Sequence, residues 1–190
     1  GELRSSPVGP KALPAASECT LWWRAGRSFL SPMEQQLLED VEQSVNRVFH
    51  AINELTGDQR AQTVRGLSWV LCPATIVHAR TADSGLLTRT RDALITYVDS
   101  GICADGSALP LLASFRELPP FCEAYEYLKS QEQLDAETRS RTDAVIAASA
   151  NHHLSCTDWG AQNRATVDAA GFYAAADSVP DHANAARWRG

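Results

Sequence analysis

The clearest pattern of apolar and polar positions begins at Ser31. Ser31, Pro32 and Glu34 combine an N-cap residue, a proline at the first helical position and an acid three residues after the cap. Apolar side chains then recur at steps of three and four, which places them on one helical face. They are Met33, Leu37, Leu38, Val41, Val45, Val48, Phe49, Ile52 and Leu55. The pattern predicts an amphipathic helix that ends at Gly57.

Caps, helix breakers and apolar spacing predict five further helices, over about 59–80, 86–100, 111–129, 135–150 and 158–178. Pro73 is expected to kink or divide the first of these, and Pro119 and Pro120 to interrupt the third. Asp135 is the expected cap of the helix over 135–150. Apolar residues surround the axis of the helix over 59–80, which predicts that it is well buried. Asp105, Gly106 and Ser107 have the composition of a turn between two helices.

The predicted helices start at intervals of roughly 25 residues, and no segment alternates like a strand. We therefore expect an all-α fold built from serial helical hairpins. Such hairpins can close into a bundle, stack as a solenoid or line up as sectors of an (α/α) toroid, and their spacing leaves these three open.

Residues 1–30 are interpreted as an extended N-terminal arm, and residues 31–190 as the helical domain. Pro7, Pro10 and Pro14 are spaced too closely for a helix. The tripeptide 21–23, Leu-Trp-Trp, is apolar enough to dock the arm onto the helical domain.

Composition narrows the classes of partner. The chain has 190 residues, of which 44% are hydrophobic and 21% charged, as is typical of globular proteins. A net charge of −6 argues against a nucleic-acid partner, because such partners select a basic face. No segment approaches the ~18 consecutive apolar residues of a membrane span. No two of the five cysteines are close in sequence, so they are either all free thiols or form one disulfide with three thiols left free. They are Cys19, Cys72, Cys103, Cys122 and Cys156.

Two short segments carry residues suited to acid–base chemistry. His152 and His153 can act as acid and base or bind a metal, but a solvated helix end is the simpler explanation of the pair. Tyr125, on the predicted helix after Arg116, can transfer a proton if cationic neighbours lower its pKa, or it can be an amphipathic core residue.

A third segment, 158–164, lies at the start of the last predicted helix and suits a carboxylated sugar. Trp159 can stack on a ring, Gln162 and Asn163 can hydrogen-bond, and Arg164 can bind a carboxylate with two donors. The alternative is a capped helix in which Trp159 packs into the core and the polar residues are solvated.

Together, residues 110–190 resemble the heparinase II/III-like and alginate-lyase group of polysaccharide lyases. The stretches that carry the resemblance are FRELPPFCEAYEYLKSQEQLDAETRSRTDAVIAASA (115–150) and DWGAQNRATVDAAGFYAAADSVPDHANAARW (158–188). The second stretch contains a turn at 179–182, similar to that family's FPDH-like turn, and the closing Trp188.

The resemblance implies a sector of an (α/α) toroid from a secreted or periplasmic enzyme that cleaves an acidic polysaccharide by β-elimination. It implies that Asn163 neutralises the uronate carboxylate, assisted by Arg164 or Gln162, with Asp158 as a rival position. The candidates for the proton-transfer residues are Tyr125 and His153. The candidates for the substrate-binding residues are Trp159, Gln162, Asp158 and Arg116. It implies no metal or cofactor, and a partner in the remainder of the same enzyme, as a second chain or domain.

Two other functions stay open. One is a non-catalytic helical-repeat module that binds a protein or glycan through a concave face. The other is a small helical enzyme that binds a metal through His152 and His153. The sequence contains no GxSxG, P-loop, GxGxxG, HExxH or EF-hand motif, which weakens hydrolase, nucleotide and calcium functions.

Overall fold

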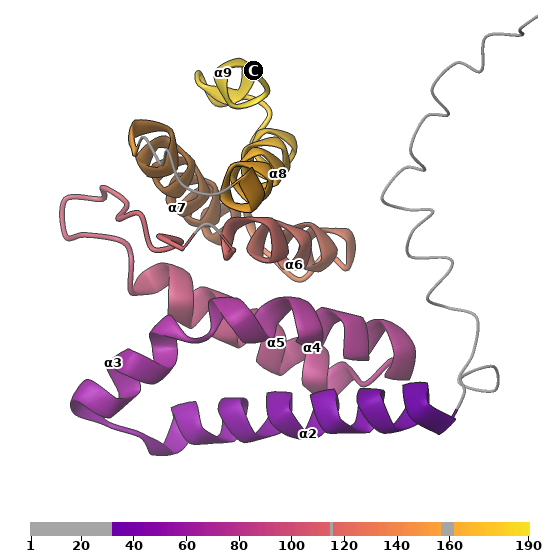
Figure 1. The fold of residues 1–190 in the computed structure, drawn as a ribbon. Coiled ribbons are helices and arrows are strands. Elements are labelled where there is room, and N and C mark those ends of the chain that lie inside the picture. The colour runs from indigo at the N-terminus through magenta and orange to yellow at the C-terminus, as the bar shows by residue number, and fades with distance from the viewer. Residues whose placement is uncertain (1–31, 115, 157–161) are drawn as a thin grey trace, which may run out of the picture.

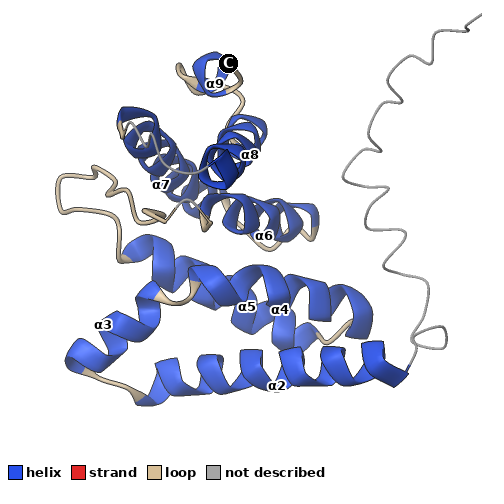
Figure 2. Ribbon diagram, in the orientation of Figure 1, coloured by secondary structure: helices blue, strands red, loops and turns tan. Residues whose placement is uncertain are grey.

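The computed structural model describes residues 32–114, 116–156 and 162–190, and within these ranges the chain forms eight helices and no strand. They are α2 (Pro32–Glu54), α3 (Gly57–Arg65), α4 (Ser68–Thr81), α5 (Ser84–Asp99), α6 (Leu118–Ser130), α7 (Ala136–Ser155), α8 (Gln162–Ser178) and α9 (Ala185–Trp188) (Figures 1 and 2). The predicted all-α class is confirmed. The arm, residues 1–30, lies outside the described residues.

The helices are stacked in two rows. In one row α2 packs on α4, α4 on α6 and α6 on α8, and in the other α3 packs on α5 and α5 on α7. Figure 1 shows α2, α4, α6 and α8 following one another from bottom to top. Sequential neighbours such as α4 and α5 also pack together, so each pair is a helical hairpin that stacks on the next. This is the serial arrangement that the spacing of helix starts predicts.

Local sequence explains where several helices begin. Asp83 precedes α5 and its Oδ1 accepts a hydrogen bond from the backbone N–H of Leu86 at 3.0 Å. Asp135 caps α7 in the same way, accepting from the N–H of Thr138 at 2.7 Å, as predicted. Pro119 and Pro120 occupy the first turn of α6, where their missing N–H groups cost nothing.

Three boundaries differ from the sequence-based expectation. The helix predicted over 135–150 continues to Ser155, so His152 and His153 lie in its last turn. The predicted helix over 59–80 is divided at Gly66 and Leu67, whereas Pro73 lies inside α4. Glycine is unfavourable inside a helix because it loses more conformational freedom than other residues, so the helix breaks at Gly66. Pro73 removes only one backbone hydrogen bond, so α4 continues through it. The helix predicted over 111–129 begins only at Leu118, because two consecutive prolines start a helix better than they continue one.

Helix α6 lies at the centre of the core, between α4 and α8. Its buried residues Phe121 and Leu128 are 0% exposed, and the Phe121 ring packs on Tyr97 of α5 with centroids 5.4 Å apart. On the α8 side, a Cβ at Gly171 would lie 3.3 Å from the Leu118 side chain, so the absent side chain allows the two helices to approach closely.

Helix α4 is buried around most of its circumference, including Leu71, Ala74 and Val77, as its apolar sequence predicts. Trp69 and Ile76 are the exceptions and remain exposed. The predicted turn at 105–107 is present: Asp105 Oδ1 accepts from the backbone N–H and the hydroxyl of Ser107, at 2.9 and 2.6 Å. None of the helices in the described part of the chain is both long and apolar enough to cross a membrane.

The cysteines among the described residues, Cys72, Cys103, Cys122 and Cys156, are free. Cys72 and Cys122 are buried, as expected for thiols that act as small apolar residues. Burial raises the pKa of the Cys122 thiol to about 12, and burial, with the charge of Glu123, raises that of Cys72 to about 12. Burial also raises the pKa of the Tyr97 phenol. These groups are poor nucleophiles and serve the core.

The raised thiol pKa values predict a loss of stability in alkali. A thiol of the unfolded chain loses its proton above about pH 8.5, whereas folded Cys122 keeps its proton until about pH 12. The free energy of unfolding therefore falls across this window. We expect Cys122→Ala to flatten the fall by about 1.4 kcal/mol per pH unit, measured by urea unfolding at several pH values. Exposed Cys156→Ala is the control, and an unchanged slope in Cys122→Ala would contradict the prediction.

Candidate functional site

A cleft of about 350 Å³ lies between α7 and the segment that follows α8. One wall is the α7 face formed by Ala144, Ala147 and Ala148, which are spaced so that they point the same way. Asp143 and Asn151 of α7 lie at the two ends of this face. The rest of the lining consists of Ala108, Val179 and His182. The cleft therefore has an apolar floor of methyl groups and a few polar side chains that can orient a ligand.

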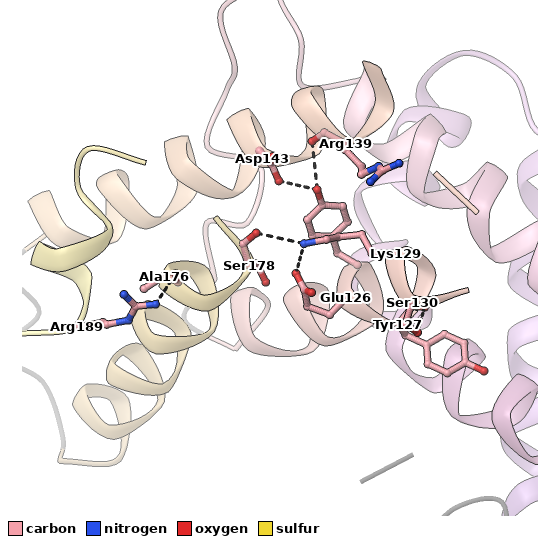
Figure 3. A network of polar contacts seen from close by, with 10 residues as sticks. Glu126, Tyr127, Lys129, Ser130, Arg139, Asp143, Ala176, Ser178 and Arg189 are labelled. Carbon is pink, nitrogen blue, oxygen red and sulfur yellow. Dashed lines mark hydrogen bonds and ion pairs between the residues drawn. The ribbon is translucent and has the colours of Figure 1, made fainter. Parts of the chain in front are cut away.

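Asp143 forms the end of the cleft nearest to α6. The hydroxyl of Tyr125 donates a 2.6 Å hydrogen bond to Asp143 Oδ1 and lies 3.3 Å from the backbone oxygen of Arg139 (Figure 3). A carboxylate has lone pairs for several donors, so the same group can also accept a bond from a ligand. Tyr125 thus orients the Asp143 carboxylate at the cleft.

The Tyr125 hydroxyl is poorly suited to be a base. Burial raises its pKa above the ordinary phenol value, and the hydrogen bond to Asp143 and the charge of that carboxylate raise it further. The ammonium of Lys129 lies 4.8 Å from the centre of the Tyr125 ring, but that cation is also paired with Glu126 at 2.8 Å. The structure places Tyr125 in the core, with its hydroxyl in a structural hydrogen bond.

A second polar cluster forms the opposite end of the cleft. Asn151 Oδ1 accepts hydrogen bonds from Asn184 Nδ2 at 2.9 Å and from Trp188 Nε1 at 3.2 Å. His182 stacks on Trp188 with ring centroids 4.7 Å apart, and its Nδ1 accepts from the backbone N–H of Asn184 at 3.1 Å. Because Nδ1 accepts, neutral His182 carries its proton on Nε2. This cluster attaches α9 to α7 and fixes the far wall of the cleft.

His153 lies outside the cleft and both of its ring nitrogens have partners. Nε2 is 2.7 Å from the backbone oxygen of Leu112, which accepts a hydrogen bond, and Nδ1 is 3.6 Å from Asp168 Oδ1. The side chain is only 10% exposed. His153 therefore ties α7 to the segment before α6 and to α8. It lies ten residues after Asp143, about 15 Å along the helix, so Tyr125 and His153 do not face one site.

The remaining candidate residues do not join the cleft in the described part of the chain. Arg116 is exposed just before α6. Asp158 and Trp159 lie outside the described residues. Gln162, Asn163 and Arg164 form the first turn of α8, and their side chains are outside the described part.

The histidine pair offers little for a metal. The His152 and His153 rings are 6.0 Å apart between centroids, and His152 Nε2 lies 3.7 Å from Cys156 Sγ whereas His153 binds Leu112 and Asp168. Among the described residues there is no group of three or more His, Cys, Asp or Glu side chains arranged to bind a metal ion.

The cleft residues are those that sequence reasoning missed. The signal that could have found them is the run of alanines in α7 at steps of three and four, bounded by Asp143 and Asn151. No family model, curated protein or solved structure matches the chain.

The cluster at Asn151 predicts a specific dependence of the C-terminal segment on one oxygen. Asn151→Ala removes the acceptor of the Trp188 indole N–H, and Trp188 is only 3% exposed. Leaving that donor unpaired should cost about 1–3 kcal/mol in urea unfolding and speed hydrogen exchange in residues 179–190. Asn151→Asp keeps an oxygen at the same position and should lose less. Equal effects of the two substitutions would show that the hydrogen bonds are not what attaches α9.

Proposed function

We propose that the protein is a non-catalytic helical-repeat module that binds a basic segment of a protein partner in the cleft along α7. The observation that carries the proposal is the cleft itself, with a carboxylate at one end, an amide and an imidazole at the other, and a floor of alanine methyl groups between them. Stacked helical hairpins commonly present such surfaces to extended partners.

The chemistry of the lining favours a protein segment over a sugar. Sugars usually stack on an exposed aromatic face, but Trp188 is 3% exposed and its ring is covered by His182. A floor of alanines instead allows the backbone or an apolar side chain of a peptide to approach closely. The ends of the floor, Asp143 and Asn151, are eight residues apart on α7, about 12 Å along the helix, which suits a short peptide.

Charge favours a cationic ligand. Asp143 places a carboxylate in the cleft, and the whole chain has a net charge of −6. A lysine or arginine of the partner can donate a charge-assisted hydrogen bond to that carboxylate, which Tyr125 holds in place. The same carboxylate would repel a uronate.

The binding proposal predicts the outcome of a peptide selection. A random peptide library selected on the immobilised full chain should yield sequences enriched in Lys or Arg at one position. Asp143→Asn keeps an oxygen for Tyr125 but removes the charge, so it should weaken binding of the selected peptides roughly 10- to 100-fold, measured by calorimetry. Asp181→Asn is the matched control, because Asp181 is exposed and does not line the cleft.

A steric variant tests whether the cleft is the site. Ala148→Phe places a ring in the cleft and should abolish peptide binding while the circular dichroism spectrum stays helical. Selected peptides that bind this variant as tightly as the wild-type chain would contradict the proposal. A selection that returns only acidic or uncharged sequences would also contradict it.

The alternative is part of a polysaccharide lyase, a sector of an (α/α) toroid that acts on a uronic-acid polymer outside the cell. It rests on the resemblance of residues 110–190 and on the alternating rows of helices, which such a toroid also has. Its carboxylate-neutralising group would be Asn163 in the first turn of α8.

The lyase alternative predicts that ultraviolet absorbance from an unsaturated product rises when the chain is mixed with alginate, heparan sulfate, hyaluronan or pectate. The expected rate falls at least about 100-fold in Asn163→Ala, since that residue would stabilise the carboxylate in the transition state. Asn46→Ala, which removes an exposed amide on α2, is the control. No absorbance change on any of the four polymers would leave the binding module as the function.

A further inference from the structure

One face of α4 is uncovered although its sequence is that of a buried helix. Trp69 is 49% exposed and Ile76 38%, whereas Leu71, Ala74 and Val77 on the other faces are fully buried. Trp69 and Ile76 are seven residues apart, so they lie on one face about 10 Å from each other. Pro73 lies between them on the same face and is half-buried. A helix that is apolar all around is normally covered on every side.

The beginning of α2 has a similar excess of apolar surface. Met33 is 82% exposed and Leu37 63%, and both continue the apolar stripe whose later members Val45, Phe49 and Ile52 are buried. Helices α2 and α4 pack together, and Figure 1 shows the beginning of α2 near the end of α4. Met33, Leu37, Trp69 and Ile76 together are called the α2–α4 apolar surface. Trp69 lies at the start of α4 and Met33 and Leu37 at the start of α2, so the four side chains are spread along the two helices.

A segment of the same chain has the composition and the reach to cover this surface. Leu21, Trp22 and Trp23 are consecutive apolar residues in the arm, and they precede Ser31 by eight to ten residues. An extended chain of that length spans about 26–36 Å. This is more than the length of α4, whose 14 residues span about 21 Å. The arm is therefore longer than α4, and the tripeptide has the reach to lie along this helix.

Charge also matches between the arm and α2. Residues 1–31 contain four basic residues (Arg4, Lys11, Arg24, Arg27) and two acidic ones (Glu2, Glu18). The first half of α2 is the reverse: residues 32–46 contain Glu34, Glu39, Asp40 and Glu42 and no basic residue. Arg24 and Arg27 lie between the apolar tripeptide and α2, so a docked arm brings opposite charges together along its path.

We infer that the α2–α4 apolar surface is the docking site of the arm of the same chain, with Leu21, Trp22 and Trp23 packing on Trp69 and Ile76. Tethering favours this occupant over a second copy, because a short linker gives the arm an effective concentration in the millimolar range. Burying two tryptophan rings against this surface supplies the driving force. The inference is independent of the α7 cleft, which lies between other elements.

Photo-crosslinking of the full chain tests the inference. p-Benzoylphenylalanine replaces Ile76, which is exposed enough to accept it, and trypsin digestion releases residues 12–24 as one peptide that contains the tripeptide. We expect a crosslink from position 76 to that peptide within one chain. Its yield should fall at least about fivefold in Trp22→Ser/Trp23→Ser, because the apolar contact is lost. Circular dichroism verifies that each variant is folded.

Position 173 supplies the matched control. Tyr173 of α8 is 54% exposed and lies on the other half of the molecule, so the same photoreactive group there should give at least about fivefold less crosslink to residues 12–24. Mixing isotopically light and heavy chains separates crosslinks within a chain from those between chains. Crosslinks only between chains, equal yields from positions 76 and 173, or no crosslink to residues 12–24 would each overturn the inference.

Discussion

The two-sided burial of α6 is the constraint on which the rest of the structure depends. Its side chains must be covered by α4 on one side and by α8 on the other, since Phe121 and Leu128 have no exposure to solvent. Hydrogen bonds set the register on the α4 side, where Ser68 donates to Glu117 at 3.1 Å and His78 Nδ1 lies 2.7 Å from the Tyr127 hydroxyl. From the first of these hydrogen bonds to the second, the residue number increases on both helices, so α4 and α6 run parallel. Helix α5 connects them in sequence, and it therefore runs in the opposite direction and lies in the second row.

The same stacking explains why the cleft forms at the C-terminal end. There, α7 packs on α5 and α8, and its alanine face is left without a covering helix. The cluster of Asn151, Asn184 and Trp188 then holds α9 and the preceding segment beside this face without filling it. A longer side chain at Ala147 or Ala148 would close the space, so the size of these residues determines whether there is a cleft. The site is a consequence of how the row of hairpins ends.

Tyr125 and His153, the titratable side chains that the sequence nominates, have structural partners. Tyr125 keeps its proton because it is buried and bonded to Asp143, and His153 joins α7 to the Leu112 carbonyl and to Asp168. The buried thiols Cys72 and Cys122 have raised pKa values and are inert as nucleophiles. What remains exposed to a ligand is a carboxylate, an amide and an imidazole over a methyl-lined floor. The carboxylate is the group that the proposed basic segment would pair with, and the floor of methyl groups is where its backbone would lie.

The sequence by itself determined the helical class, the positions of most helices and the cap at Asp135, because caps, prolines and apolar spacing act over a few residues. The sequence predicted a helix break near Pro73, whereas the break lies at Gly66 and Leu67. A proline can remain inside a helix when the packing of its buried neighbours holds that helix together. Only the tertiary structure decided that Tyr125 and His153 form structural hydrogen bonds and that the cleft exists. The cleft joins Ala108, residues 143–151 and residues 179–182, and the partners Tyr125–Asp143 and His153–Leu112 are 18 and 41 positions apart. Local patterns carry no information on such contacts, because they depend on how whole helices pack.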